Sequence, residues 1–138
     1  MRIISNKFIP LKNFTAINIL GVIFTRLPAD ALSNRLKRHE AIHTAQQYEI
    51  LGLSALVSLA LCNIFASWWY LLASVLMPLA IYFLAWIVEL LLPPYATAYK
   101  DSPFEREAYA NDHDGDYLVR RRLFAWVGYI MDSNDRKQ

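Results

Sequence analysis

The chain has 138 residues, which allows one domain but not two. Its hydrophobic fraction of 56% is high for a soluble domain of this size. The formal net charge of +2 is too small to indicate a nucleic-acid partner, and the single cysteine, Cys62, excludes an intramolecular disulfide.

Residues 1–28 combine β-branched and aromatic residues with turn signals, which predicts a small N-terminal β element. We expect two strands there, of which the uncharged run from Ala16 to Thr25 is the better one. A short buried helix or a membrane-dipping segment is the alternative for this run, which is too short to span a bilayer. The first residues do not resemble a signal peptide, because Lys7 and Lys12 interrupt the apolar run.

A helix is expected next, over about residues 30–50, with Asp30 or Ser33 as its N-cap. It contains an H-E-x-x-H motif that begins at His39 and ends at His43. Histidines at positions i and i+4 lie on the same face of a helix, so both can reach one zinc ion. Glu40 is then close enough to act as general base on a water that the metal activates. Two histidines do not complete such a site, so a third ligand must come from elsewhere.

From Ile50 to Val88 the sequence has 39 residues without a charged side chain. A spanning helix needs about 20 apolar residues, so the region 50–92 predicts a two-helix transmembrane hairpin, with helices at about 50–66 and 70–92. A buried hairpin in a soluble protein is the alternative, but little of the chain remains to cover it. Seven of the 14 lysines and arginines precede the hairpin and seven follow it. The positive-inside rule therefore predicts an integral membrane protein with both termini cytoplasmic, and we expect a bacterial inner membrane.

C-terminal helices are predicted over residues 102–131. Ser102 is a suitable N-cap, Pro103 fits the first helical position, and Glu105 stands where a capping box has its acid. The apolar residues from Tyr117 to Met131, around three arginines, favour an amphipathic helix at the lipid headgroups. Packing on the rest of the protein is the alternative. The predicted fold class is therefore a mainly α integral membrane protein with a small N-terminal β element.

Several acidic residues and one histidine are candidates for the third ligand: Glu89, Glu105, Glu107, His113 and the aspartates between Asp112 and Asp116. A carboxylate at the centre of a bilayer costs about 2.5–3.5 kcal/mol, which often marks function, but Glu89 is close enough to Pro93 to reach the interface. Glu105 and Glu107 are two positions apart on one helix, roughly 200° round, so only one can face the metal. We expect Glu107 to point away together with Asn111.

The segment HEAIHTAQQ, the hydrophobic hairpin and the segment FEREAY resemble the HtpX and CAAX-prenyl-protease type of membrane zinc metallopeptidase. In that group, membrane helices separate an H-E-x-x-H helix from an E-x-E-A-D segment, whose first glutamate is the third zinc ligand. The resemblance implies that His39, His43 and Glu105 bind Zn²⁺ and that Glu40 is the catalytic base.

The same resemblance identifies candidates for outer contacts around the ligands. The family has an aspartate one turn after the ligand glutamate, and this position is Tyr109 here. Asp112, a further turn along the same face, is the candidate replacement, and a contact from Glu89 is the second choice.

Together these features predict zinc-dependent peptide hydrolysis at the cytoplasmic membrane face, with a peptide or membrane-protein segment as substrate. The uncharged strand between Ile17 and Phe24 is expected to bind an extended substrate along its edge. The alternative is a metal-binding or structural membrane protein without catalytic activity, which assembles with a partner.

Overall fold

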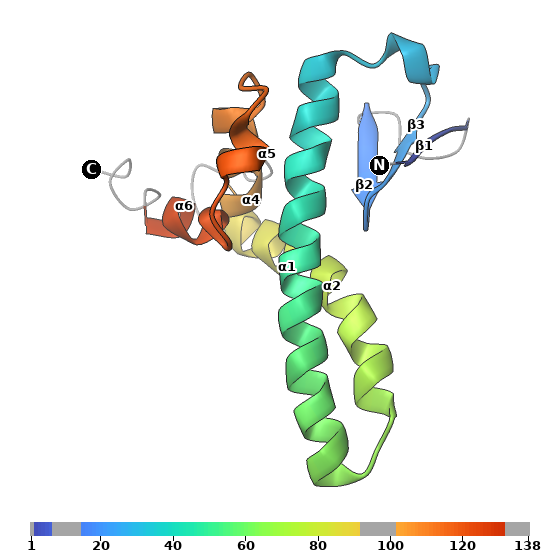
Figure 1. Cartoon of the computed structure of the whole chain (residues 1–138), viewed down its shortest axis with the longest axis vertical. Coiled ribbons are helices and arrows are strands. Elements are labelled where there is room, and N and C mark those ends of the chain that lie inside the picture. The colour runs from blue at the N-terminus through green and yellow to red at the C-terminus, as the bar shows by residue number, and fades with distance from the viewer. Residues whose placement is uncertain (1, 7–14, 92–101, 132–138) are drawn as a thin grey trace.

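The computed structural model describes residues 2–6, 15–91 and 102–131. Its elements follow in the order β1 (Arg2–Ser5), β2 (Ala16–Ile19), β3 (Val22–Thr25), η1 (Ala29–Ala31), α1 (Asn34–Phe65), α2 (Trp69–Leu91), α4 (Pro103–Asn111), α5 (Tyr117–Arg120), η3 (Ala125–Val127) and α6 (Gly128–Met131). Figure 1 shows α1 as the axis of the molecule, with the sheet on one side of its N-terminal half and α4, α5 and α6 on the other. The predicted mainly helical fold and small N-terminal β element are confirmed.

The β element contains three strands in the order β1-β3-β2, not the two that we predicted. β1 pairs in parallel with β3, and β2 pairs with β3 in antiparallel orientation. The run from Ala16 to Thr25 is not one strand, because the chain reverses at Leu20 and Gly21, whose φ angles are 48° and 82°. Two consecutive positive φ values make the tight turn of a two-residue hairpin, and Gly21 takes such an angle without steric cost.

Helix α1 joins two elements that we predicted as separate helices. It begins after the N-cap Ser33, whose Oγ accepts a hydrogen bond from the backbone N–H of Leu36 at 3.1 Å. It then continues through Ile50 to Phe65 and ends at Ala66, which has a positive φ of 50°. The predicted boundary near residue 50 is wrong because nothing there stops a helix, and the neighbouring Gly52 alone only weakens one.

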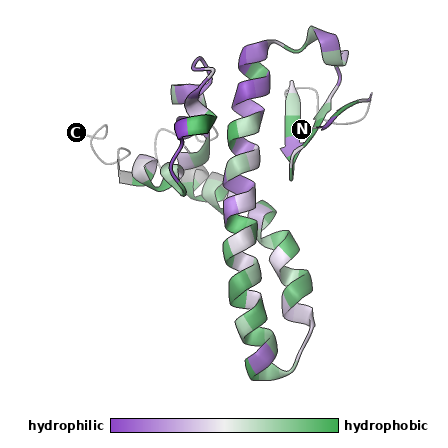
Figure 2. Cartoon of the chain, viewed as in Figure 1, coloured by the Kyte–Doolittle hydropathy of each residue, from purple (hydrophilic) through white to green (hydrophobic). Residues whose placement is uncertain are grey.

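The C-terminal half of α1 and the whole of α2 form an apolar part of the molecule, where the two helices pack against each other. Within the described ranges, α1 is the one helix long and apolar enough to cross a membrane, while α2 contributes the shorter apolar stretch Trp69–Ala85. Figure 2 shows hydrophobic residues along both helices of this part and hydrophilic residues gathered at the opposite end. Many large apolar side chains here are exposed, among them Leu56, Ile64, Phe65, Trp68, Trp69, Leu72, Leu76, Phe83 and Leu91.

In the C-terminal region, the first predicted helix forms, but the second does not form as one continuous element. α4 begins as expected, with Ser102 Oγ accepting a hydrogen bond from the backbone N–H of Glu105 and with Pro103 in its first turn. The amphipathic helix predicted for residues 117–131 is instead split into α5, η3 and α6. The chain becomes extended at Arg121 and takes a positive φ of 56° at Phe124. The Arg121 side chain lies in the interior, where it pairs with two carboxylates, and this position is incompatible with one exposed helix.

Candidate metal centre

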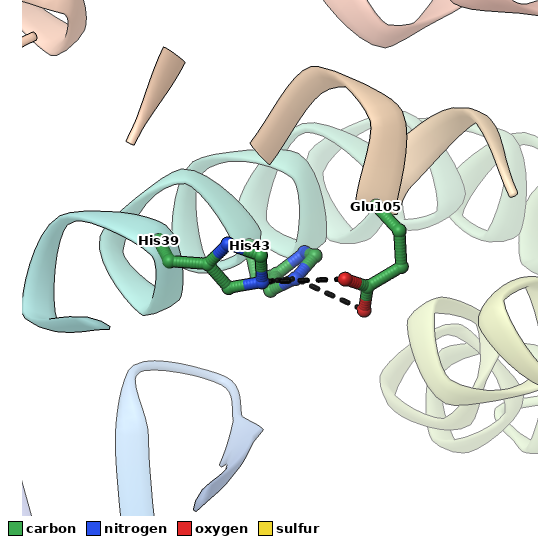
Figure 3. Close-up of side chains that lie close together, drawn as sticks. All are labelled: His39, His43 and Glu105. Atoms are coloured by element: carbon green, nitrogen blue, oxygen red, sulfur yellow. Dashed lines mark hydrogen bonds and ion pairs between the residues drawn. The ribbon is translucent and has the colours of Figure 1, made fainter. Parts of the chain in front are cut away.

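Two histidines of α1 and one glutamate of α4 converge at a buried point (Figure 3). The Nε2 atoms of His39 and His43 are 3.2 Å apart. Glu105 places one carboxylate oxygen 3.2 Å from Nε2 of His39 and the other 3.3 Å from Nε2 of His43. The structure thus brings together the three residues that the sequence selected, and they form a cluster that could hold a metal ion.

The spacing of these ligand atoms fits a small divalent cation. A tetrahedral zinc ion with bonds of about 2.0–2.1 Å holds neighbouring ligand atoms about 3.3–3.4 Å apart. The three separations of 3.2, 3.2 and 3.3 Å lie close to that value. Two imidazole lone pairs and a carboxylate at this distance repel one another unless a proton or a cation lies between them. Nitrogen and oxygen ligands suit zinc and several other first-row metals, so these ligands identify a metal site but do not identify which metal it binds.

The outer nitrogen of His39 faces Asp112, the C-cap residue of α4. Oδ2 of Asp112 is 3.6 Å from Nδ1 of His39, and its Oδ1 accepts a hydrogen bond from Nε of Arg35 at 2.8 Å. Arg38 Nε donates to the backbone carbonyl of the same aspartate at 2.7 Å. A carboxylate behind a ligating histidine orients the ring and raises its basicity. Asp112, which the sequence analysis proposed for an outer contact around the ligands, thus lies behind His39.

The outer nitrogen of His43 faces Gln46, a contact that the sequence analysis missed. Gln46 Oε1 lies 2.8 Å from Nδ1 of His43, and the residue is fully buried. Tyr82 of α2 donates its hydroxyl to the same amide oxygen at 2.5 Å. The available signal was the position of Gln46 on the same helical face as the histidines, three residues after His43. The sequence alone does not show that this amide is buried beside a ligand, because α2 and α4 cover it only in the folded protein.

Glu40 is buried beside the cluster, in the part of α1 that precedes the charge-free stretch beginning at Ile50. Burial raises the pKa of its carboxyl, and the nearby His43 and His39 oppose this increase. Its backbone carbonyl accepts hydrogen bonds from Asn18 Nδ2 of β2 and from Thr44 Oγ1. The sheet is thus attached directly to the motif helix at the residue that we expect to be the base.

Glu107, which we expected to point away from the metal, is not part of the cluster of His39, His43 and Glu105, and its side chain is fully buried. Its carboxylate accepts hydrogen bonds from Arg121 Nε at 2.5 Å, Tyr117 at 2.9 Å and Gln46 Nε2 at 2.9 Å. Glu107 is buried because α4 packs on α1 with one face and on the C-terminal segments with another. Burial of Tyr117 and the charge of Glu107 raise the pKa of this tyrosine. For Arg121, burial opposes the charge, but the hydrogen bonds to Glu49 and Glu107 prevail and raise its pKa.

The remaining candidates lie around or outside this cluster. The ring of Tyr109 packs edge-on against His39 with a centroid separation of 4.7 Å, and burial followed by the charge of Glu105 raises its pKa. His39 opens on one side to a cleft of about 350 Å³ lined by Ser33, Arg35, Leu36, Tyr109 and Asp112. His113 is exposed and is not part of the cluster. The side chain of Glu89 lies outside the described residues.

No family model matches this chain, and neither does any curated protein or solved structure. The residues of the site are therefore the basis for assigning this protein to a class. Two histidines one helical turn apart, a glutamate from a second helix and a buried carboxylate next to the first histidine make up a candidate His2Glu metal centre.

Proposed function

We propose that this protein is an integral-membrane zinc peptidase, of the HtpX and CAAX-prenyl-protease type, that hydrolyses peptide bonds at the cytoplasmic membrane face. The observation that carries the proposal is the convergence of His39, His43 and Glu105 within 3.3 Å of one another beside the buried Glu40. When bound, zinc supplies Lewis acidity to the substrate carbonyl and lowers the pKa of the attacking water.

Glu40 moves the proton in this reaction. Its carboxylate accepts a proton from the water as the oxygen attacks the peptide carbonyl, and then delivers that proton to the departing amine nitrogen. Burial raises its pKa toward the range in which a carboxyl both accepts and releases a proton efficiently. A cation held by the two histidines would favour the ionised form of the same carboxyl, so Glu40 begins the reaction as a base.

The cleft next to His39 gives a substrate access to these groups. It lies between the start of α1 and the end of α4, and Arg35 and Tyr109 line it. β2 is an edge strand of the sheet, and its Asn18 contacts the backbone of Glu40. Gln47 of α1 donates to the Asn18 carbonyl at 3.1 Å and accepts from the Leu20 N–H at 2.6 Å, so an extended peptide that pairs with β2 by β-addition would have to displace this side chain.

The apolar part of the molecule supports a membrane location as a two-helix hairpin. The charge-free part of α1, residues 50–65, extends about 24 Å, and the 23 residues of α2 extend about 34 Å, at 1.5 Å per residue. These lengths approach the hydrocarbon thickness of about 30 Å. Exposed side chains such as Leu56, Ile64 and Leu76 would then contact lipid tails. The equal division of basic residues before and after the proposed hairpin supports a topology with both termini in the cytoplasm.

Metal content and cleavage, measured on the same preparations, test this function. Protein purified in detergent should contain zinc and cleave an unfolded protein substrate. Glu40→Gln should keep the metal and lose about 10²–10⁴-fold in rate, because it removes the proton acceptor and no ligand. Zinc binding without cleavage by either protein would favour the alternative, a metal-binding membrane protein without catalytic activity. Equal cleavage by both would refute the role of Glu40.

A further inference from the structure

A chain of buried polar side chains connects His43 with the C-terminal segment. It runs from Nδ1 of His43 to Oε1 of Gln46 at 2.8 Å, and from Nε2 of Gln46 to Oε2 of Glu107 at 2.9 Å. Arg121 Nε then contacts Oε1 of Glu107 at 2.5 Å. Gln46 and Glu107 are fully buried, and the Arg121 side chain is 4% exposed. Four residues from α1, α4 and the segment after α5 therefore form one continuous contact network behind a candidate metal ligand.

The partners of Gln46 determine how its amide is oriented. Its Nε2 atom lies 2.9 Å from the carboxylate of Glu107 and 3.1 Å from the backbone carbonyl of Phe104. Both partners are acceptors, because a backbone carbonyl has no hydrogen to donate and the carboxylate of Glu107 already accepts hydrogen bonds from Arg121 and Tyr117. The NH₂ group of Gln46 must therefore point toward them, which directs Oε1 toward His43.

The amide orientation in turn determines which nitrogen of His43 carries hydrogen. An amide oxygen only accepts hydrogen bonds, so Nδ1 of His43 has to be the donor in their 2.8 Å contact. In the neutral ring, Nε2 then carries the lone pair. This is the nitrogen that lies 3.2 Å from His39 Nε2 and 3.3 Å from Glu105.

We propose that Gln46, Glu107 and Arg121 are positioning residues that fix the metal-binding tautomer of His43. The inference rests on the metal centre of the proposed function and extends it to residues that touch neither metal nor substrate. Arg121 keeps Glu107 an acceptor, Glu107 keeps the Gln46 amide in one orientation, and Gln46 keeps hydrogen on Nδ1. The packing of the segment that carries Arg121 against α4 is thereby coupled to the orientation of His43 in the metal site.

The test uses the Glu107→Gln variant of the full-length protein in detergent. The new amide can donate as well as accept, so Gln46 keeps only the Phe104 carbonyl of the two obligatory acceptors that orient its NH₂ group. The tautomer of His43 is measured by nitrogen-15 NMR of histidine-labelled, metal-free protein, at a pH where the ring is neutral. Zinc affinity is measured separately by competition with a chromophoric chelator. We expect a mixture of tautomers and an affinity lower by about 10–100-fold, the usual effect of losing a partner behind a ligand.

Glu49→Gln is the matched control. Glu49 pairs with the other side of the Arg121 guanidinium, and its side chain is 6% exposed, but none of its described contacts reaches Gln46. This variant loses the same charge and should keep the wild-type tautomer and zinc affinity. If Glu107→Gln does not fold, Gln46→Met removes the acceptor directly and should give the same two changes.

Two results would overturn the proposal. One is a folded Glu107→Gln protein with the wild-type tautomer, and the other is an equal loss of zinc affinity in Glu49→Gln. The tautomer is read without metal or peptide, so a protein that binds no zinc or cleaves nothing would refute the proposed function and leave this measurement valid.

Discussion

Replacing Arg121 with methionine should be among the most destabilising single substitutions in this protein. The guanidinium lies between two carboxylates and contacts Glu107 at 2.5 and 3.2 Å and Glu49 at 3.1 Å. The side chains of these carboxylates are 0% and 6% exposed. Methionine fills a similar volume, so the substitution mainly removes the charge and leaves both acids without their cation.

The expected loss follows from the asymmetry of buried ion pairs. Forming such a pair contributes little to stability, but removing one partner costs about 3–5 kcal/mol, because the remaining charge stays buried. A protein of this length loses roughly 2–4 °C in Tm for each kcal/mol. We therefore expect Tm to fall by roughly 6–20 °C.

The neighbouring Arg120 provides the control. Its side chain is 69% exposed and pairs with Asp114, and such surface pairs are worth about 0–1 kcal/mol. Thermal unfolding of Arg121→Met and Arg120→Met, followed by circular dichroism in the same detergent, compares the two losses of charge directly. Equal changes in Tm would refute the idea that the buried position of Arg121 determines its effect.

Four further results follow from the same structure. His39→Ala and His43→Ala should each remove most of the bound zinc, measured by elemental analysis, because two remaining ligands do not compete with water and buffer. Glu105→Gln should also lose the metal, and full retention of zinc would exclude it as the third ligand. Asp112→Asn should keep the fold and lower zinc affinity by about 10–100-fold in chelator competition, since the carboxylate that orients His39 is lost. A reporter fused to the C-terminus should be labelled only from the cytoplasmic side, and labelling only from outside would refute the predicted topology.

Local patterns in the sequence, together with the family resemblance, were sufficient to predict the three candidate ligands. The spacing of His39 and His43 requires only a helix, and α1 provides one. Ser102 and Pro103 mark the start of α4, which fixes the face on which Glu105 lies. The resemblance to a known family then selected this glutamate from several acidic residues, and the structure brings it to the two histidines.

The contacts behind the ligands depend on packing between distant segments and left no local pattern. Gln46 is an ordinary polar residue of an amphipathic helix until α4 and α2 cover it. We expected Glu107 to point away from the metal, but the sequence does not reveal that the C-terminal segment covers that side of α4. From the sequence we expect Glu107→Gln to keep the metal with little change in stability, whereas the proposed network predicts a lower zinc affinity for this variant.

The continuity of α1 constrains how a substrate can reach this site. Ile50 lies seven positions after His43 on an uninterrupted helix, so this ligand lies about 10 Å from the start of the charge-free stretch. Tyr82 of α2 contacts Gln46 at the same level, which ties the second apolar helix to the centre. Within the described residues, α1 has no break in this interval that could move the ligands toward the lipid. If the apolar part lies in a bilayer, the bond to be cleaved must therefore rise out of the hydrocarbon to meet Glu40, which favours substrate segments just outside the membrane.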